Sequence, residues 1–140
     1  MVPTLTSIGV HVLSEKIRKI AVVEDDEDIL VLLTGYFVQK GHEVLDAFSN
    51  ATLNLFENEK PDLYVIDYIL SGSNKNGLEI AVDILGKSPK MPILFLTAFE
   101  HIDAEISKNT VFRDKNIGIL IKPVKLLEIE NLISDLLVKA

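Results

Sequence analysis

The chain has 140 residues and a formal net charge of −7 at neutral pH, from 14 basic and 21 acidic side chains. This length fits one domain, so we expect no second one, and the acidic surface argues against direct binding of nucleic acid or anionic membranes. Because there is no cysteine, no signal-peptide pattern and no apolar stretch of the roughly 18 residues that a membrane span needs, we expect a globular cytoplasmic protein without disulfides.

The chain from residue 18 onward has the pattern of repeated β–α units. Short apolar runs alternate with segments of helical spacing, which predicts a parallel sheet that helices bury on both faces. Residues 1–17 lack this regularity, and we treat them as an N-terminal extension of unknown role. In chain order, the predicted strands are residues 19–24, 43–47, 62–67, 93–96 and 117–121. The predicted fold class is therefore α/β, with a doubly wound five-stranded sheet.

A helix is predicted after every strand. The first ends at Gly41, since glycine suits a C-terminal cap, and the second begins at Asn50 and ends before Pro61. The apolar faces of the third and the last helix are formed by Leu78, Ala81, Ile84 and Leu85, and by Ile129, Leu132, Ile133, Leu136 and Leu137. Only Ile102 and Ile106 mark the fourth helix, and residues 109–116 are predicted to form a loop.

Four of the predicted strands lead into polar side chains. Glu24 and Asp25 lie at the end of the first strand, Asp67 ends the third, Thr97 follows the fourth and Lys122 follows the fifth. The carboxyl ends of parallel strands share one edge of the sheet, which is where open α/β sheets bind ligands. We therefore expect carboxylates, a hydroxyl and an ammonium in one crevice.

These groups suit phosphoryl transfer. Clustered carboxylates repel one another unless a cation neutralises them, and oxygen ligands with open water positions suit Mg²⁺. Asp67 can attack a phosphoryl group, while Lys122 offsets its charge and Thr97 donates a hydrogen bond. Taken singly, each group also fits an ordinary role as a strand-end cap, a surface ammonium or a helix N-cap, and residues 26–28 are interpreted as a solvated helix start. Their joint position at one edge favours the functional interpretation.

The motifs at these strand ends resemble those of the receiver domain of two-component response regulators. The matching segments are residues 20–26, 65–67, 77–79, 95–98 and 121–123, within a region of resemblance that spans residues 18–140. The resemblance implies a flavodoxin-like sheet with strand order 2-1-3-4-5.

The resemblance also implies a metal site and a phosphoacceptor. Glu24 and Asp25 would organise Mg²⁺, with Asp25 as a direct ligand. Asp67 would be both the phosphorylated residue and a metal ligand, and the backbone carbonyl of Ile69 would complete the protein ligands.

The remaining implied roles concern the phosphoryl group and its source. Thr97 would move toward the bound group, and Lys122 would contact it just before Pro123, which is commonly cis in the family. The donor would be a sensor histidine kinase or a histidine phosphotransfer protein. The downstream protein target is not identified by the sequence, and homodimerisation is left open.

This chain departs from the family pattern near the predicted site. Ser71 occupies a position, four residues after Asp67, that is usually proline, and Ile119 replaces an aromatic residue that often changes rotamer when the threonine moves. Ile69 and Phe99 are large and apolar, and we hypothesise that they shield an acyl phosphate from water.

We favour a phosphoacceptor signalling switch that catalyses its own aspartyl phosphorylation and slow dephosphorylation, without being a conventional enzyme. With no output domain in the chain, its signal would pass through a binding partner or by onward phosphotransfer. The alternative is a receiver-like interaction module that works without phosphorylation. A phosphohydrolase is disfavoured, because such enzymes typically need a second aspartate where Ile69 stands.

Overall fold

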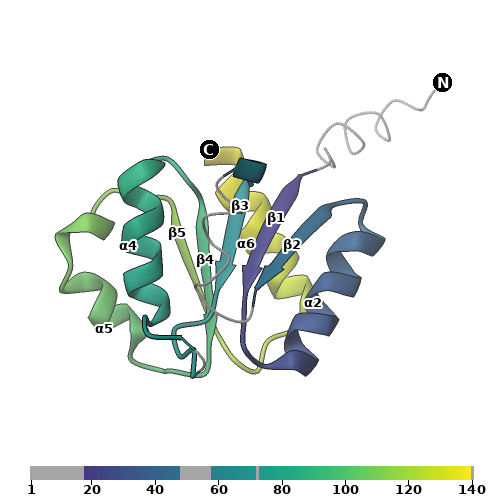
Figure 1. The fold of residues 1–140 in the computed structure, drawn as a ribbon, viewed down its shortest axis with the longest axis horizontal. Helices are drawn as coiled ribbons and strands as arrows, with labels where there is room; N and C mark the ends of the chain where they lie inside the picture. The colour runs from purple at the N-terminus through teal and green to yellow at the C-terminus, as the bar shows by residue number, and fades with distance from the viewer. Residues whose placement is uncertain (1–17, 48–57, 72, 140) are drawn as a thin grey trace.

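A five-stranded sheet forms the centre of the computed structural model, which describes residues 18–47, 58–71 and 73–139 (Figure 1). The strands are β1 (Lys19–Val23), β2 (Glu43–Ala47), β3 (Leu63–Ile66), β4 (Ile93–Thr97) and β5 (Ile117–Ile121). All neighbouring strands are parallel, and they lie in the order β2-β1-β3-β4-β5. Both the predicted fold class and the implied strand order are confirmed.

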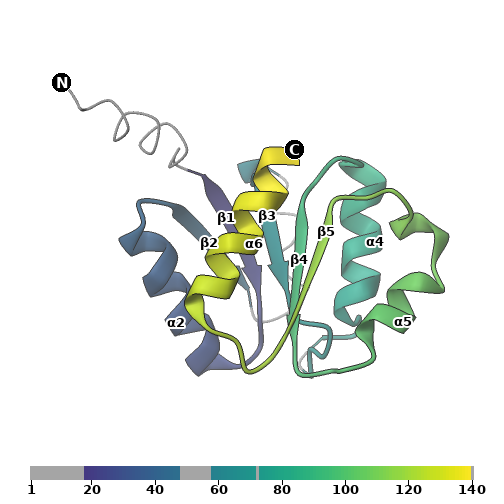
Figure 2. The same ribbon diagram turned by 180° about the vertical axis from the view of Figure 1, so that it is seen from behind.

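Helices cover both faces of this sheet. The described residues contain the α-helices α2 (Glu27–Gln39), α4 (Gly77–Lys87), α5 (Ile102–Ser107) and α6 (Leu126–Lys139). α2 and α6 lie on one face, while α4 and α5 lie on the other (Figures 1 and 2). The helix predicted from Asn50 lies largely outside the described residues, as does the N-terminal extension. None of the described helices is long and apolar enough to cross a membrane.

Side-chain and glycine caps set the ends of α2. The Asp26 carboxylate accepts hydrogen bonds from the backbone N–H groups of Asp28 and Ile29, at 3.0 and 3.2 Å, and so satisfies donors of the first turn. At the other end, Gly41 adopts φ +90°, and its N–H donates to the carbonyl of Val38 at 3.0 Å. The predicted helix start and the predicted glycine cap are both confirmed.

Two apolar cores follow from the alternation of side chains along each strand. In β1, Ile20 and Val22 pack on the α2–α6 side, whereas Ala21 and Val23 pack on the side of α4 and α5. All four side chains are fully buried. A strand buried on both faces in this way positions whatever follows it with little freedom.

The segment after α5 differs from the predicted loop. Thr110–Phe112 form a 3-10 turn, η2, and the buried ring of Phe112 packs edge-on against Phe95, with ring centroids 6.1 Å apart. The loop prediction is wrong at these residues, because a single apolar anchor in a polar stretch creates no periodicity that a sequence pattern can detect.

The N-terminus of α4 is pressed against the backbone of Asp67. A Cβ added at Gly77 would lie 2.1 Å from the Asp67 carbonyl oxygen, so a side chain at this position forces the backbone apart. We predict that Gly77→Ala lowers the free energy of unfolding by about 2 kcal/mol or more in urea titrations.

The matched control lies in the same helix. A Cβ at Gly86 would meet nothing within 4 Å, so Gly86→Ala is expected to leave stability unchanged or to raise it by up to about 1 kcal/mol. Equal effects of the two substitutions would contradict the close approach at Gly77.

Candidate functional site

The register of β1 and β3 brings the first two predicted carboxylates together. Val23 and Ile66 are paired, and the Asp67 N–H continues the ladder by donating to the Val23 carbonyl at 3.0 Å. Glu24 and Asp67 therefore follow at neighbouring points on the sheet edge. By alternation, both continue the rows of side chains that face α2 and α6.

The register of β4 and β5 positions the hydroxyl and the ammonium in the same way. Thr97 is paired with Ile121, and the Lys122 N–H donates to the Thr97 carbonyl at 2.8 Å. The peptide bond between Lys122 and Pro123 is cis, as the family resemblance implies. The structure thus brings residues from four strand ends to one edge.

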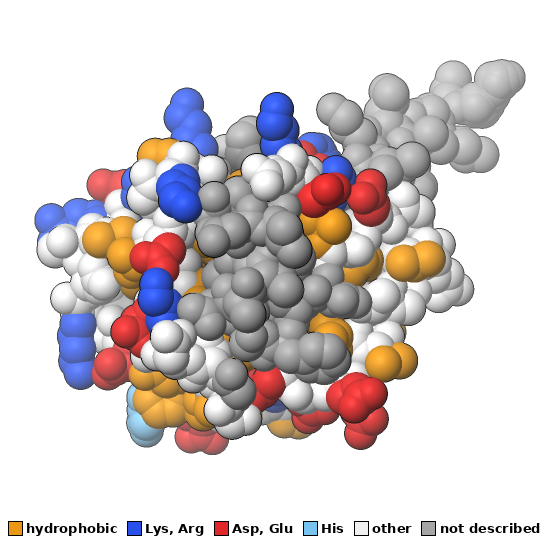
Figure 3. Space-filling model, viewed as in Figure 1, with side chains coloured by type: hydrophobic (Ala, Val, Ile, Leu, Met, Phe, Trp, Pro, Cys, Tyr) orange, Lys and Arg blue, Asp and Glu red, His pale blue; other side chains and the backbone are white. Residues whose placement is uncertain are grey.

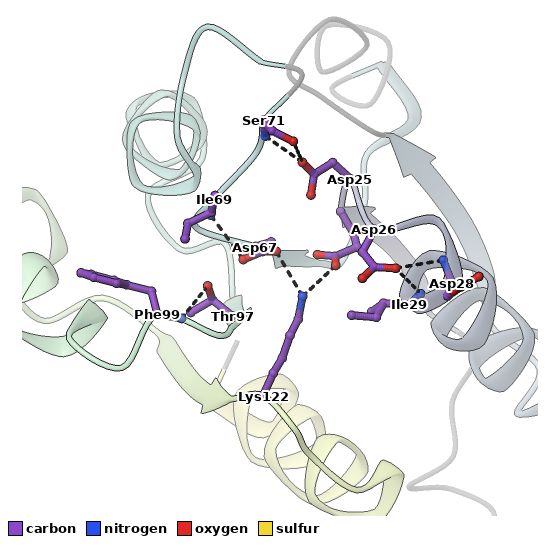
Figure 4. A network of polar contacts seen from close by, with 11 residues as sticks. Asp25, Asp26, Asp28, Ile29, Asp67, Ile69, Ser71, Thr97, Phe99 and Lys122 are labelled. Atoms are coloured by element: carbon purple, nitrogen blue, oxygen red, sulfur yellow. Dashed lines mark hydrogen bonds and ion pairs between the residues drawn. The ribbon is translucent and has the colours of Figure 1, made fainter.

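Lys122 connects the two carboxylates. Its Nζ lies 2.7 Å from Glu24 Oε1 and 3.1 Å from Asp67 Oδ2, and Figure 4 shows the Lys122 side chain pointing toward Asp67. Glu24 is 2% and Asp67 7% exposed, so this ion pair lies where water can screen it little. Asp67 Oδ1 also accepts a hydrogen bond from the Ile69 N–H at 3.3 Å.

The pKa values of Glu24 and Lys122 are both raised, so each group holds its proton more tightly. Burial raises the pKa of Glu24 from 4.5 to about 7, and repulsion from Asp67 adds to this, although hydrogen bonding to Lys122 acts in the opposite direction. Burial alone would lower the pKa of Lys122, but its hydrogen bond to Glu24 and the charge of Asp67 raise it overall. Burial therefore favours the protonated form of Glu24, and the two carboxylates favour the charged form of Lys122.

Asp25 completes an acidic cluster with Glu24 and Asp67. One carboxylate oxygen from each residue can be chosen so that all three lie within 4.8 Å of one another, close enough to share a cation. Acidic side chains also appear at several points along the lower edge of Figure 3, which in this view is the edge formed by the carboxyl ends of the strands. Three oxygen donors without nitrogen or sulfur ligands suit a hard cation such as Mg²⁺.

Thr97 is fully buried at the end of β4. Its Oγ1 accepts a hydrogen bond from the Phe99 N–H at 3.3 Å, and the Phe99 ring stacks on Tyr68 with centroids 4.9 Å apart. The loops that follow β3 and β4 are therefore in direct contact. Ile119, by contrast, has no ring to stack and packs in the core on the α4–α5 side.

Two features of the site were not predicted. Ser71 donates two hydrogen bonds to Asp25, from its N–H at 2.7 Å and from its Oγ at 2.6 Å, and Tyr68 stacks on Phe99. In the sequence, Ser71 stands out only because it replaces the usual proline, and nothing marks Tyr68. Both contacts join separate loops, so no local sequence pattern indicates them.

The family model for the response regulator receiver domain matches residues 20–134. The chain belongs to this family. The match covers every predicted site residue and all five strands except the first residue of β1.

Solved structures support this assignment. The receiver domain of NtrX from Brucella abortus is 26% identical with a TM-score of 0.75, and the alignment covers 86% of this chain and 99% of that one. The response regulator TrrA from Thermotoga maritima, solved in complex with Mg²⁺-BeF, is 25% identical with a TM-score of 0.71, over 86% of this chain and 99% of that one. A longer NtrX structure from Brucella abortus is 26% identical with a TM-score of 0.73 over 89% of this chain, but the chain spans only 28% of its length.

Because the pKa of Glu24 is raised, the stability of the metal-free receiver domain should depend on pH. Because the folded state holds this proton more tightly than the unfolded state, the contribution of Glu24 to stability is present below pH 4.5 and is lost as the pH rises through about 7. We predict that the free energy of unfolding of Glu24→Gln equals that of the wild type near the low end of this pH range. Above the range it should exceed the wild-type value by about 1–3 kcal/mol.

The measurement is urea unfolding with a chelator present, at pH values below, within and above this window. Glu27→Gln replaces an exposed carboxylate in the first turn of α2 and serves as the control. A stability difference for Glu24→Gln that does not change with pH would contradict the prediction.

Proposed function

We propose that this receiver domain is a phosphoacceptor switch, in which Asp67 receives a phosphoryl group from a phosphohistidine of a sensor histidine kinase or a histidine phosphotransfer protein. The observation that carries the proposal is the position of Asp67: a nearly buried carboxylate with an ammonium at 3.1 Å, inside an acidic cluster that can share a cation. A carboxylate placed in this way can act as a nucleophile. Its surroundings can accept the further negative charge of a phosphoryl group only if a cation is also bound.

In the proposed reaction, a carboxylate oxygen of Asp67 attacks the phosphorus atom. A P–O bond forms and the P–N bond to the donor imidazole breaks, so that the electron pair of that bond stays on the imidazole nitrogen. Lys122 offsets the charge of the phosphoryl oxygens, and the Thr97 hydroxyl donates a hydrogen bond to one of them. The Thr97 hydroxyl oxygen accepts a hydrogen bond from the Phe99 N–H, and this bond either breaks or persists while the hydroxyl donates to the phosphoryl oxygen.

Glu24, Asp25, Asp67 and the backbone carbonyl of Ile69 would hold Mg²⁺. The oxygen-only donor set fits this ion, and so does the arrangement of three carboxylates around the single ammonium of Lys122. Bound Mg²⁺ would supply positive charge beside the phosphoryl oxygens and reduce repulsion among the carboxylates.

Phosphorylation would change the surface through the contacts of Asp67. The added charge attracts Lys122 and Thr97, which belong to the ends of β5 and β4, and thereby biases the loops that follow these strands. A downstream protein that binds these loops would then distinguish the two forms.

The central prediction concerns mass gain with a small phosphodonor. Incubation with acetyl phosphate and Mg²⁺ should add one phosphoryl group to the wild-type protein and none to Asp67→Asn, and a chelator should abolish the gain. Intact-protein mass spectrometry measures the result. Asp83→Asn, on the exposed side of α4, is the matched control and should be modified like the wild type.

Two outcomes would overturn the proposal. A gain that persists in Asp67→Asn would assign the phosphoryl group to another residue. No gain in the wild type, from either acetyl phosphate or a phosphorylated histidine donor, would favour the phosphorylation-independent interaction module.

Ile69 and Phe99 carry a prediction about the lifetime of the phosphoryl group. Ile69 is 54% exposed next to Asp67, and Figure 4 shows it on the same side of the site as Phe99. If both shield the acyl phosphate from water, the double variant Ile69→Asn, Phe99→Glu should lose its phosphoryl group several-fold faster than the wild type. Val138→Asn changes an exposed apolar residue near the end of α6 and should have no effect. An unchanged half-life in the double variant, followed by mass spectrometry after donor removal, would exclude shielding.

A further inference from the structure

Ser71 forms a two-point contact with the proposed metal ligand Asp25. Its backbone N–H and its hydroxyl both donate to the same oxygen, Asp25 Oδ2, at 2.7 and 2.6 Å (Figure 4). The contact joins the loop after β3 to the loop after β1, across 46 positions of the chain. Two donors on one oxygen define the orientation of a carboxylate far better than one donor does.

Asp25 needs such a contact more than its neighbours in the cluster. Glu24 and Asp67 are buried and bonded to Lys122, whereas Asp25 is only half-buried and lies one residue before the cap of α2. A half-exposed carboxylate without partners samples several rotamers, and each of them must be given up when a metal binds.

The Ser71 side of the contact is itself well anchored. The preceding residue, Leu70, is buried in the core, and its carbonyl accepts a hydrogen bond from the Ser73 N–H at 3.1 Å. Ser71 therefore offers donors from a loop that is held in place on both sides. A proline at this position would offer neither the N–H nor the hydroxyl.

We propose that Ser71 is a positioning residue that sets the Asp25 carboxylate for Mg²⁺ binding, by occupying Oδ2 and leaving the other oxygen for the ion. The inference rests on the proposed function, because it takes the acidic cluster as the Mg²⁺ site. Hydrogen bonds to ligating carboxylates are typical of metal sites, and their loss weakens metal affinity by roughly 10- to 100-fold where the partner is essential. Since Ser71→Ala keeps the N–H donor, its expected effect is smaller, about three- to tenfold.

The test is an isothermal titration of the unphosphorylated protein with Mg²⁺ alone. Ser71→Ala should bind Mg²⁺ about three- to tenfold more weakly than the wild type, while Ser71→Thr, which retains both donors, should bind with nearly wild-type affinity. Ser73→Ala removes another hydroxyl of the same loop, one that accepts a hydrogen bond from the Lys75 N–H, and it is the matched control. Urea unfolding of each variant verifies that the fold is intact.

A second readout separates positioning from a general loss of structure. In phosphorylation by acetyl phosphate, the Mg²⁺ concentration for half-maximal rate should rise in Ser71→Ala by the same factor as the dissociation constant, while the rate at saturating Mg²⁺ stays near that of the wild type. A fall in the saturating rate without a change in Mg²⁺ affinity would overturn the positioning role.

The outcomes also separate this inference from the proposed function. If the wild type binds Mg²⁺ and Ser71→Ala binds it equally or more tightly, Ser71 does not position Asp25, and the phosphoacceptor function stands. If the wild type binds no Mg²⁺, both the inference and the proposed function fail.

Discussion

The site depends on the balance of charge around Lys122. Within the acidic cluster of the described residues, one ammonium faces two nearly buried carboxylates, and the half-buried carboxylate of Asp25 lies close by. Removing Lys122 would leave Glu24 and Asp67 buried without a counter-charge, which costs several kcal/mol in typical proteins. Even with Lys122, the raised pKa values of Glu24 and Lys122 show that the cluster still favours additional positive charge. A bound divalent cation would supply this positive charge, and the carboxylates that the proposed chemistry uses would stay ionised.

The parallel sheet keeps these carboxylates close together despite their mutual repulsion. Backbone pairing places Glu24 and Asp67 at the ends of buried strands, and the Gly77 N–H, which donates to the Tyr68 carbonyl at 2.8 Å, ties the loop after β3 to α4. Because the surrounding core is close-packed, the carboxylates cannot separate far enough to relieve their repulsion. The stability of the fold thus maintains a locally unfavourable charge distribution, as is common at functional sites.

The sequence predicted what is local and periodic. Apolar runs followed by polar residues located Asp67, Thr97 and Lys122, because parallel strands bring their carboxyl ends to one edge whatever the loops between them do. The contacts of Ser71 and Tyr68 could not be predicted, since each depends on how two loops approach each other, and loop conformation leaves no repeating signal. The 3-10 turn at Phe112 escaped prediction because one buried ring in a polar stretch creates no periodicity. The Mg²⁺ ligands and the phosphoacceptor were assigned by resemblance, and the geometry supports them as proposals.

The unpredicted contacts are concentrated on the loops that would transmit a signal. At position 119 the chain has isoleucine, which packs in the core. An aromatic contact to Thr97 comes instead from Phe99, whose N–H donates to the Thr97 hydroxyl and whose ring stacks on Tyr68, directly after Asp67. Rotation of Thr97 away from the Phe99 N–H would therefore act on a ring that already touches Tyr68, in the loop that follows Asp67. Under the proposed function, the contacts of Thr97 with Phe99 and of Phe99 with Tyr68 would connect the site to the surface through the two loops at the sheet edge, rather than through the side chains of β5.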